Sequence, residues 1–323
     1  MSDQYANQQL SFKEAQSSPC MDCQVSCCRY LPLQDFQITT FAQLDYAFYL
    51  CNFANIELAL VDGQTWRAHY RAQCSRLDES NRCTLHNTPQ KPKVCQRYNG
   101  YTCFYKPMFE CSESDRFIRF DRARLEAFAN LLTFDGHRNI VGYPDIVTLR
   151  QSLPVFHEVK KDPIVLTIEP SSNPSLRFSD FQNPCQKCKG WCCVNLSFPF
   201  SGIHNVGNLD YVWFCLGFPN VEIGISQEGW TVVIQTSCQF FNPTLPEGQF
   251  CSVFGTDQRP LQCEMYDASA CAYKAQFSTQ FPKNYLRVTT AQFHQLASLY
   301  CFDEHAQLRH APNFEELQSL LRS

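Results

Sequence analysis

The sequence predicts an α+β protein of two tandem cysteine-rich domains, each with short helices and a β-hairpin around a cluster of thiolates. Three observations support this prediction. The spacing Cys-x2-Cys-x3-Cys-Cys occurs twice, each time directly after a proline, Pro19 or Pro184. Later cysteines recur in the same order, and the helical and hairpin patterns between them recur as well. Such self-similarity indicates two copies of one structural unit.

The recurring cysteines form two matched sets of eight. The first copy holds Cys20, Cys23, Cys27, Cys28, Cys74, Cys83, Cys95 and Cys103. The second copy holds Cys185, Cys188, Cys192, Cys193, Cys238, Cys251, Cys263 and Cys271. The offset between matched cysteines stays between 164 and 168 residues. The remaining cysteines are best explained as small buried hydrophobes: Cys51, Cys111, Cys215 and Cys301.

The duplication also divides the chain. We expect a first domain at residues 10–153, a linker at 154–175 and a second domain at 176–321. The linker is marked by four prolines, Pro154, Pro163, Pro170 and Pro174. Each domain is long enough for a modest hydrophobic core of its own.

Composition and the N-terminal residues favour a cytoplasmic protein. Hydrophobic residues make up 44% of the 323 residues, which is typical of a globular chain. No run of 18 apolar residues exists, so we expect no membrane span. The first residues have neither a basic n-region nor an apolar h-region, so no secretion signal is predicted. In a reducing cytosol, 20 cysteines favour metal ligation over a disulfide framework.

The first predicted element after each cysteine arm is a helix. Apolar residues recur at helical spacing from Phe41 to Tyr49, with Thr39 or Thr40 as the N-cap. The counterpart lies around residues 209–213, and both copies contain Leu-Asp-Tyr. We expect Asp45 and Asp210 to cap or hydrogen-bond a loop rather than to catalyse, because no acid or base repeats beside them.

A β-hairpin follows in each copy. Residues 56–61 and 66–73 flank Asp62-Gly63, and residues 221–226 and 230–237 flank Glu228-Gly229. Each second strand leads into a cysteine, Cys74 or Cys238. The end of a strand is a rigid place from which to present a ligand.

The next cysteines, Cys95 and Cys263, follow a basic residue and a proline: Lys91-Pro92 in the first copy and Arg259-Pro260 in the second. These cations are close enough in sequence to offset thiolate charge. A solvated loop charge is the other interpretation.

Two further helices close each copy. One contains Leu125, Phe128, Ala129 and Leu132, matched by Phe293, Leu296, Ala297 and Tyr300. The last, short helix contains Pro144, Ile146 and Leu149, matched by Pro312, Phe314 and Leu317. Between them lie His137 and His305, the one histidine pair that recurs. Hydrogen bonding at a helix end is the favoured role for this pair, with a supplementary metal ligand as the alternative.

The type of ligand atom limits which metals the predicted sites can bind. Sixteen thiolates with no repeated carboxylate exclude a hard-ion site and leave Zn2+, an Fe-S cluster such as 4Fe-4S, or copper(I). On an extended backbone, neighbouring side chains point to opposite faces. The adjacent pair Cys27 and Cys28 is therefore expected to serve two neighbouring sites or one polynuclear cluster.

The net charge and its distribution along the chain indicate which classes of partner to expect. The formal net charge is −4, and thiolates bound to divalent ions would make it more negative, so no nucleic-acid partner is expected. Residues 67–106 hold eight Lys or Arg against Asp78 and Glu79. This excess fits an acidic protein partner that docks on Arg71, Arg76 and Arg82, or simply a solvated face.

The ordered set of eight cysteines, which in the second copy includes the motif Arg-Pro-x2-Cys-x2-Tyr, resembles the YkgJ-type cysteine cluster family (CxxCxxCC). That family is described as zinc- or iron-chelating and is related to the cysteine-rich part of the flagellin lysine-N-methylase. The resemblance covers both copies and implies a metal or iron-sulfur centre in each. The first copy departs from it at two positions, with Val25 where the second has Gly190 and Lys91 where the second has Arg259.

The sequence therefore predicts a metal-binding protein with a zinc or iron-sulfur thiolate centre in each domain, acting as a non-enzymatic, electron-transfer or accessory module. One alternative is an iron-sulfur-dependent protein-modifying enzyme that transfers methyl groups, which the methylase relationship implies. The chain has neither a Cys-x3-Cys-x2-Cys arm nor a Gly-x-Gly-x-x-Gly loop, so no catalytic residue is assigned. Another alternative is a protein-interaction scaffold stabilised by zinc.

Overall fold

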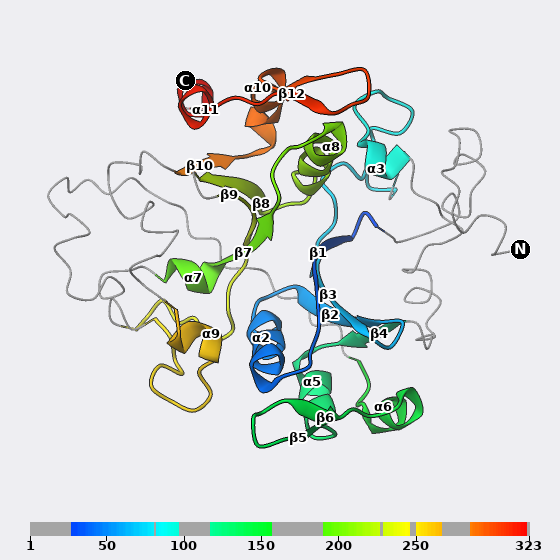
Figure 1. Cartoon of the computed structure of the whole chain (residues 1–323), viewed down its shortest axis with the longest axis vertical. Coiled ribbons are helices and arrows are strands. Elements are labelled where there is room, and N and C mark those ends of the chain that lie inside the picture. Colours follow the sequence, from blue (N-terminus) through cyan, green and yellow to red (C-terminus); the bar gives the residue numbers. More distant parts are fainter. Residues whose placement is uncertain are drawn as a thin grey trace, which may run out of the picture.

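The computed structural model describes residues 27–80, 82–96, 117–156, 190–226, 229–245, 250–266 and 285–321. Over these residues the chain is a mixed α+β protein, as predicted, with two four-stranded antiparallel sheets and short helices around them (Figure 1). Six predicted ligands lie outside the described residues: Cys20, Cys23, Cys103, Cys185, Cys188 and Cys271. Cys111 and most of the predicted linker also lie outside them.

The first sheet confirms the predicted hairpin and adds two strands to it. Its strands are β1 (Tyr30–Phe36), β2 (Ile56–Val61), β3 (Thr65–Arg71) and β4 (Phe117–Phe120), in the order β1-β3-β2-β4. In the β2–β3 turn, Asp62 and Gly63 both have positive φ, 49° and 69°, as a tight hairpin turn requires. The edge strand β1 contains Pro32, and its register shifts between Pro32 and Gln34.

The second sheet repeats the first. Its strands are β7 (Asn195–Phe200), β8 (Val221–Ser226), β9 (Gly229–Gln235) and β10 (Tyr285–Val288). The order β10-β8-β9-β7 is the order of the first sheet read from its other edge. The edge strand β7 also carries a proline, Pro199. We call the parts of the chain that contain the two sheets the first and the second repeat.

The main helices match the predicted ones. α2 (Phe41–Cys51) begins with a capping box formed by Thr40 and Gln43, and α8 (Val206–Cys215) is capped by Asn205. α5 (Arg122–Ala129) corresponds to the 3-10 helix η7 (Thr290–Gln292) followed by α10 (Phe293–Ser298). The last helices are α6 (Ile146–Ser152) and α11 (Phe314–Leu321).

Several short elements complete the repeats. Three single-turn helices occur near cysteines: α3 (Lys93–Gln96), α7 (Trp191–Val194) and α9 (Leu261–Glu264). Each repeat also has a small hairpin, β5 (Thr133–Phe134) with β6 (Ile140–Gly142) and β11 (Cys301–Phe302) with β12 (Leu308–His310).

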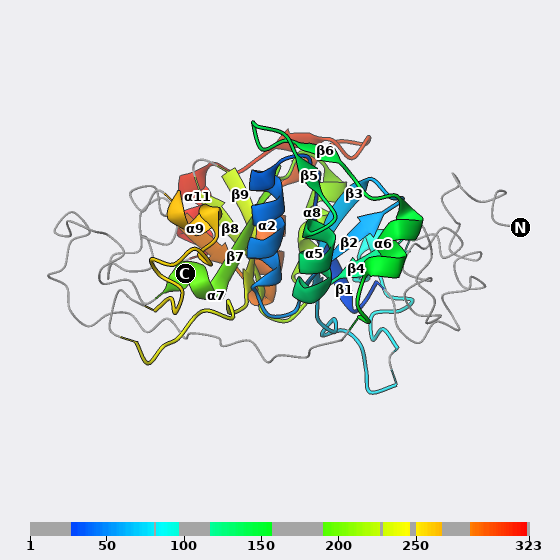
Figure 2. The same cartoon turned by 90° about the horizontal axis from the view of Figure 1, so that it is seen from below.

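The repeats share one hydrophobic core, whereas the sequence suggested one core for each. The main cluster of buried hydrophobic side chains includes Trp66 and Phe120 from the first repeat and Phe198 and Ile223 from the second. A smaller separate cluster consists of Trp191, Val194 and Phe241. Figure 2 shows α2 in the middle of the molecule, with β7–β9 on one side and β2–β4 on the other. The continuous core contains buried side chains from the sheets and main helices of both repeats, among them Leu44 and Leu50 of α2 and Val212 of α8.

No helix within the described ranges is both long enough and apolar enough to span a membrane.

Candidate metal centres

In the first repeat, cysteines from four separate segments gather beside the edge of the sheet. Cys27 precedes β1, Cys74 follows β3, Cys83 lies in the next loop and Cys95 lies in α3. Burial raises the pKa of Cys95, and the charges of Cys27, Cys74 and Cys83 raise it further. Cys27 and Cys95 line the same pocket, and the Cys74 N–H donates to the carbonyl of Cys28, so these segments lie side by side. We call the four thiols the first thiol set.

The second repeat gathers the matching four, which we call the second thiol set. Cys192 lies in α7, Cys238 follows β9, Cys251 lies in a loop and Cys263 lies in α9. Burial raises the pKa of Cys263 to about 12, with further contributions from the other three thiols. The backbone arrangement is the same in both sets. Cys74 N–H donates to the Cys28 carbonyl and Cys238 N–H donates to the Cys193 carbonyl, both at 2.7 Å.

The backbone at the adjacent cysteines of the second arm is helical, not extended. Gly190, at φ 78°, starts the helical turn α7, and helical side chains are rotated by about 100° rather than reversed. The thiols of Cys192 and Cys193 hydrogen-bond to each other, which lowers the pKa of Cys192 and raises that of Cys193. Cys27 and Cys28 lie in a turn as well. Both members of a pair can therefore face one cluster.

The thiol sets are gathered but are not closed ligand shells. Among the described residues, no group of three or more His, Cys, Asp or Glu side chains has the geometry to hold a metal ion. The structure thus brings together eight of the sixteen predicted ligands in two sets of four, with Cys28 and Cys193 adjacent to them in the chain. The donor chemistry fits a thiophilic metal, because the converging atoms are sulfurs.

Cations lie beside both sets, as the sequence suggested. Lys91 opposes the rise in the pKa of Cys95, and Arg259 opposes the rise in the pKa of Cys263. Arg259 Nη2 donates to the Cys263 carbonyl at 2.8 Å, and its Nε is buried without a hydrogen-bond acceptor among the described residues. The buried Nε and the bond to the Cys263 carbonyl show that Arg259 is not simply a solvated loop charge. Both cations suit a site that accumulates negative charge.

Sequence reasoning missed a third cation, Arg76, as a neighbour of the first thiol set. Its charge opposes the rise in the pKa of the half-buried Cys74. The guanidinium carbon lies 3.7 Å from the ring centroid of Trp213, and Nη2 donates to the Trp213 carbonyl at 2.9 Å. The available signal was its position two residues after Cys74, but the second repeat has Phe240 there, so no repetition marked it.

A repeated carboxylate was also missed. Glu57 in β2 pairs with Arg71 at 2.9 Å and with Arg119 at 2.7 Å. The matching Glu222 in β8 pairs with Arg287 and accepts a hydrogen bond from Gln235 at 2.9 Å. Both carboxylates are therefore neutralised on the sheets and are not candidate ligands. The same contacts engage Arg71, so of the three arginines considered for an acidic partner only Arg82 is exposed.

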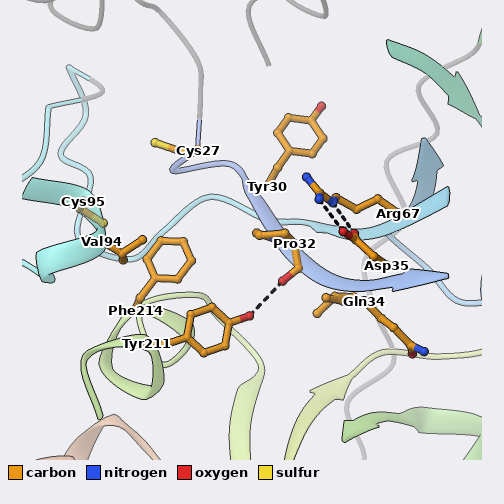
Figure 3. Close-up of a pocket in the computed structure, with 11 residues that line it drawn as sticks. Cys27, Tyr30, Pro32, Gln34, Asp35, Arg67, Val94, Cys95, Tyr211 and Phe214 are labelled. Carbon is orange, nitrogen blue, oxygen red and sulfur yellow. Dashed lines mark hydrogen bonds and ion pairs between the residues drawn. The ribbon is translucent and has the colours of Figure 1, made fainter. Parts of the chain in front are cut away.

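A pocket of about 500 Å³ opens onto the first thiol set between the repeats (Figure 3). Cys27 and Cys95 line it together with Pro32 from β1 and with Tyr211 and Phe214 from α8. Tyr211 Oη donates to the Pro32 carbonyl at 3.2 Å and so joins the two walls. Asp35 and Arg67 form an ion pair of 2.5 Å at the polar end of the pocket. The pocket gives a small molecule or ion a route to these two thiols.

A second cavity, of about 670 Å³, reaches Cys238 of the second thiol set. Its lining is more polar than that of the first pocket and includes Glu57, Arg71, Asp121 and Arg122. It is formed by residues of both repeats, as the first pocket is. Each thiol set therefore borders a cavity at the junction of the repeats.

The other candidate residues lie elsewhere. His137 and His305 are exposed at the tips of the small hairpins, where Asp135 and Asp303 accept their backbone N–H groups at 2.9 Å. The predicted helix-end role is wrong because these segments form hairpins, and neither histidine belongs to a thiol set. Cys215 is buried, as predicted, but Cys301 is exposed.

The described residues thus define a duplicated α+β protein with two gathered thiol sets at the junction of its repeats. No family model, curated protein or solved structure matches the chain. The resemblance to the YkgJ-type cysteine cluster family therefore stays a prediction from the cysteine spacing.

Proposed function

We propose that the chain is a metal-binding protein in which each repeat holds a thiolate centre of zinc or iron-sulfur type. The observation that carries the proposal is the repeated convergence of four thiols from four separate segments. Four thiolates are the ligand number of a tetrahedral zinc site and of a 4Fe-4S cluster. The predicted ligands of each centre also include cysteines outside the described residues.

The charges around the sets support the same proposal. A zinc tetrathiolate or a 4Fe-4S centre carries net negative charge, and buried negative charge needs nearby cations or hydrogen-bond donors. Arg76 and Lys91 stand beside the first set and Arg259 beside the second. Bound zinc would cross-link the loops, whereas an iron-sulfur cluster would supply one-electron chemistry.

One observation favours a second candidate function, that of an iron-sulfur-dependent protein-modifying enzyme. The pocket of about 500 Å³ places Cys27 and Cys95 beside a cavity with aromatic walls, where a substrate could approach the centre. Incubation of the metal-loaded chain with S-adenosylmethionine and candidate proteins tests this. Methyl transfer by the chain alone would favour the enzyme, and its absence from a fully loaded chain would favour the binding module.

The primary test is anaerobic purification followed by elemental analysis, sulfide determination and an absorption spectrum. We expect stoichiometric metal, with a broad band near about 400 nm for an iron-sulfur protein or no colour for a zinc protein. Cys95→Ser and Cys263→Ser should each remove the metal of one centre. Cys301→Ser is the matched control, because Cys301 is exposed and lies outside both thiol sets. Oxygen-protected protein that carries no metal and melts identically after chelator treatment would refute the proposal.

A further inference from the structure

The aspartate of the repeated Leu-Asp-Tyr sequence contacts the opposite repeat. Asp210, in α8 of the second repeat, accepts hydrogen bonds from the backbone N–H groups of Lys93 at 2.6 Å and Val94 at 3.0 Å. These two residues open α3, the single-turn helix that carries Cys95. The carboxylate uses one oxygen for each amide, so both of its oxygens are engaged.

Asp45, in α2 of the first repeat, makes the reciprocal contact. Its Oδ2 accepts the N–H of Leu261 at 2.8 Å, and the backbone of Gln262 also donates to this carboxylate. Leu261 opens α9, the helix that carries Cys263. Pro260 at the N-cap position of α9 offers no side-chain acceptor, so Asp45 takes the capping role from the other repeat.

A second pair of backbone hydrogen bonds also joins each thiol set to the opposite repeat. Ser75, directly after Cys74, donates its N–H to the Gly217 carbonyl of the second repeat at 2.8 Å. Gln239, directly after Cys238, donates its N–H to the Asn52 carbonyl of the first repeat at 2.7 Å. Two cysteine-bearing segments of each thiol set are thus attached to the opposite repeat, one to its main helix and one to the residues directly after that helix.

We propose that each metal centre is assembled in trans, with Asp210 positioning Cys95 of the first centre and Asp45 positioning Cys263 of the second. This inference rests on the proposed metal-binding function and adds that neither repeat builds its own centre alone. A single helical turn does not hold its conformation in isolation, because nucleation costs more than one turn returns. Charge-assisted bonds to its first amides therefore decide where its thiol points.

The two aspartates are positioning residues rather than catalytic ones, since they reach the centres only through backbone amides. Substitution of residues that orient metal ligands in this way typically lowers metal affinity by about tenfold to hundredfold. If the contacts act in trans, substitution of an aspartate must lower the metal affinity of the centre in the opposite repeat. A general loss of stability would weaken both centres together.

The test uses the full-length chain with one centre disabled at a time. Cys263→Ser leaves the first centre to be measured and Cys95→Ser leaves the second. In each background, Asp45→Asn and Asp210→Asn are compared by anaerobic competition for Zn2+ with a chromophoric chelator. We expect Asp210→Asn to weaken Zn2+ binding by the first centre about tenfold or more and to leave the second within about twofold. Asp45→Asn should show the reverse pattern.

Hydrogen exchange provides a readout that does not require metal. In the metal-free chain, Asp210→Asn should speed amide exchange at Lys93 and Val94, and Asp45→Asn should speed it at Leu261 and Gln262. Equal losses of affinity at both centres, or losses confined to the aspartate's own repeat, would overturn the inference while metal binding stood. A wild-type chain that binds no Zn2+ or iron would overturn the proposed function, and the inference with it.

Discussion

Gly190 determines how the second cysteine arm enters its helical turn. Its φ of 78° lies in the left-handed region, and a Cβ added there would lie 2.7 Å from the Phe241 ring. An alanine at this position therefore meets both backbone strain and a steric clash. Gly63 has a similar φ of 69° but open space around it, so it meets the strain alone.

We expect Gly190→Ala to lower the free energy of unfolding more than Gly63→Ala does. Left-handed backbone costs a non-glycine residue about 1–2 kcal/mol, and the contact with Phe241 adds to this for Gly190 only. Urea unfolding of the two variants, followed by circular dichroism, measures the difference. Equal losses would mean that the Phe241 ring moves aside at no cost.

The buried His69 predicts an acid-dependent loss of stability. Burial lowers the pKa of His69 to about 3 from an ordinary 6.5, so the folded state keeps the ring neutral. The unfolded chain binds a proton below about pH 6.5, and stability is therefore complete above that pH and falls as the pH drops from about 6.5 toward about 3. At pH 5 the free energy of unfolding is about 2 kcal/mol lower than above pH 6.5 because of this histidine.

The variant His69→Val tests this, because the second repeat carries Val233 at the same place opposite a strand glutamate. The fall in unfolding free energy between pH 7.5 and pH 5 should be about 2 kcal/mol smaller in the variant than in the wild type. His137→Val, at an exposed position, is the control and should keep the wild-type fall. An unchanged pH dependence in His69→Val would contradict the assignment.

At the residue scale, repetition in the sequence marked the cysteines of both thiol sets and some, but not all, of the cations beside them. Cys95, Cys263, Lys91 and Arg259 were found because repetition marks them. Arg76 was missed, since its place beside the thiols depends on Trp213, which lies 137 residues further along the chain. Long-range contacts of this kind leave no local pattern to read.

Among the elements, those with a local signal were predicted correctly. The hairpin β2–β3 follows from alternation and a turn sequence, and α2 follows from helical spacing with a threonine cap. The outer strands were missed for physical reasons. β1 and β7 carry prolines that weaken a strand pattern, and β4 has only four residues, so its pairing with β2 depends on tertiary contact.

The strand ion pairs give a prediction at this scale. Glu222 and Arg287 join β8 to β10 with side chains only 16% and 14% exposed. Glu222→Gln leaves the Arg287 charge buried, and we expect it to lower the free energy of unfolding by about 3 kcal/mol. Asp35→Asn, at an ion pair whose carboxylate is 48% exposed, should cost no more than about 1 kcal/mol. Denaturant unfolding of both variants at pH 7 decides this, and similar losses would contradict it.

The continuous core determines how the whole molecule behaves. Trp66 and Phe198 belong to one buried cluster although they come from different repeats. Separating the repeats would expose apolar surface on both, and it would remove the reciprocal contacts of Asp45 and Asp210. The sequence predicted the duplication but not this shared core, because matching the two copies says nothing about how they face each other.

We therefore expect the repeats to fold together and not apart. Residues 1–160 and 161–323 expressed separately should aggregate or lack a cooperative thermal transition, whereas co-expression should yield a complex that melts near the intact chain. Size-exclusion chromatography and calorimetry measure both outcomes. A single half that melts cooperatively at the temperature of the intact chain would contradict the shared core.

Because Asp45 and Asp210 each cap a helix of the opposite repeat, they restrict how far the two duplicated copies could diverge in sequence. Asp45 serves the cysteine helix of the other copy, and Asp210 serves that of the first. If these contacts position metal ligands as proposed, neither copy could lose its aspartate without harm to the centre of the other. Selection on either half would then preserve both.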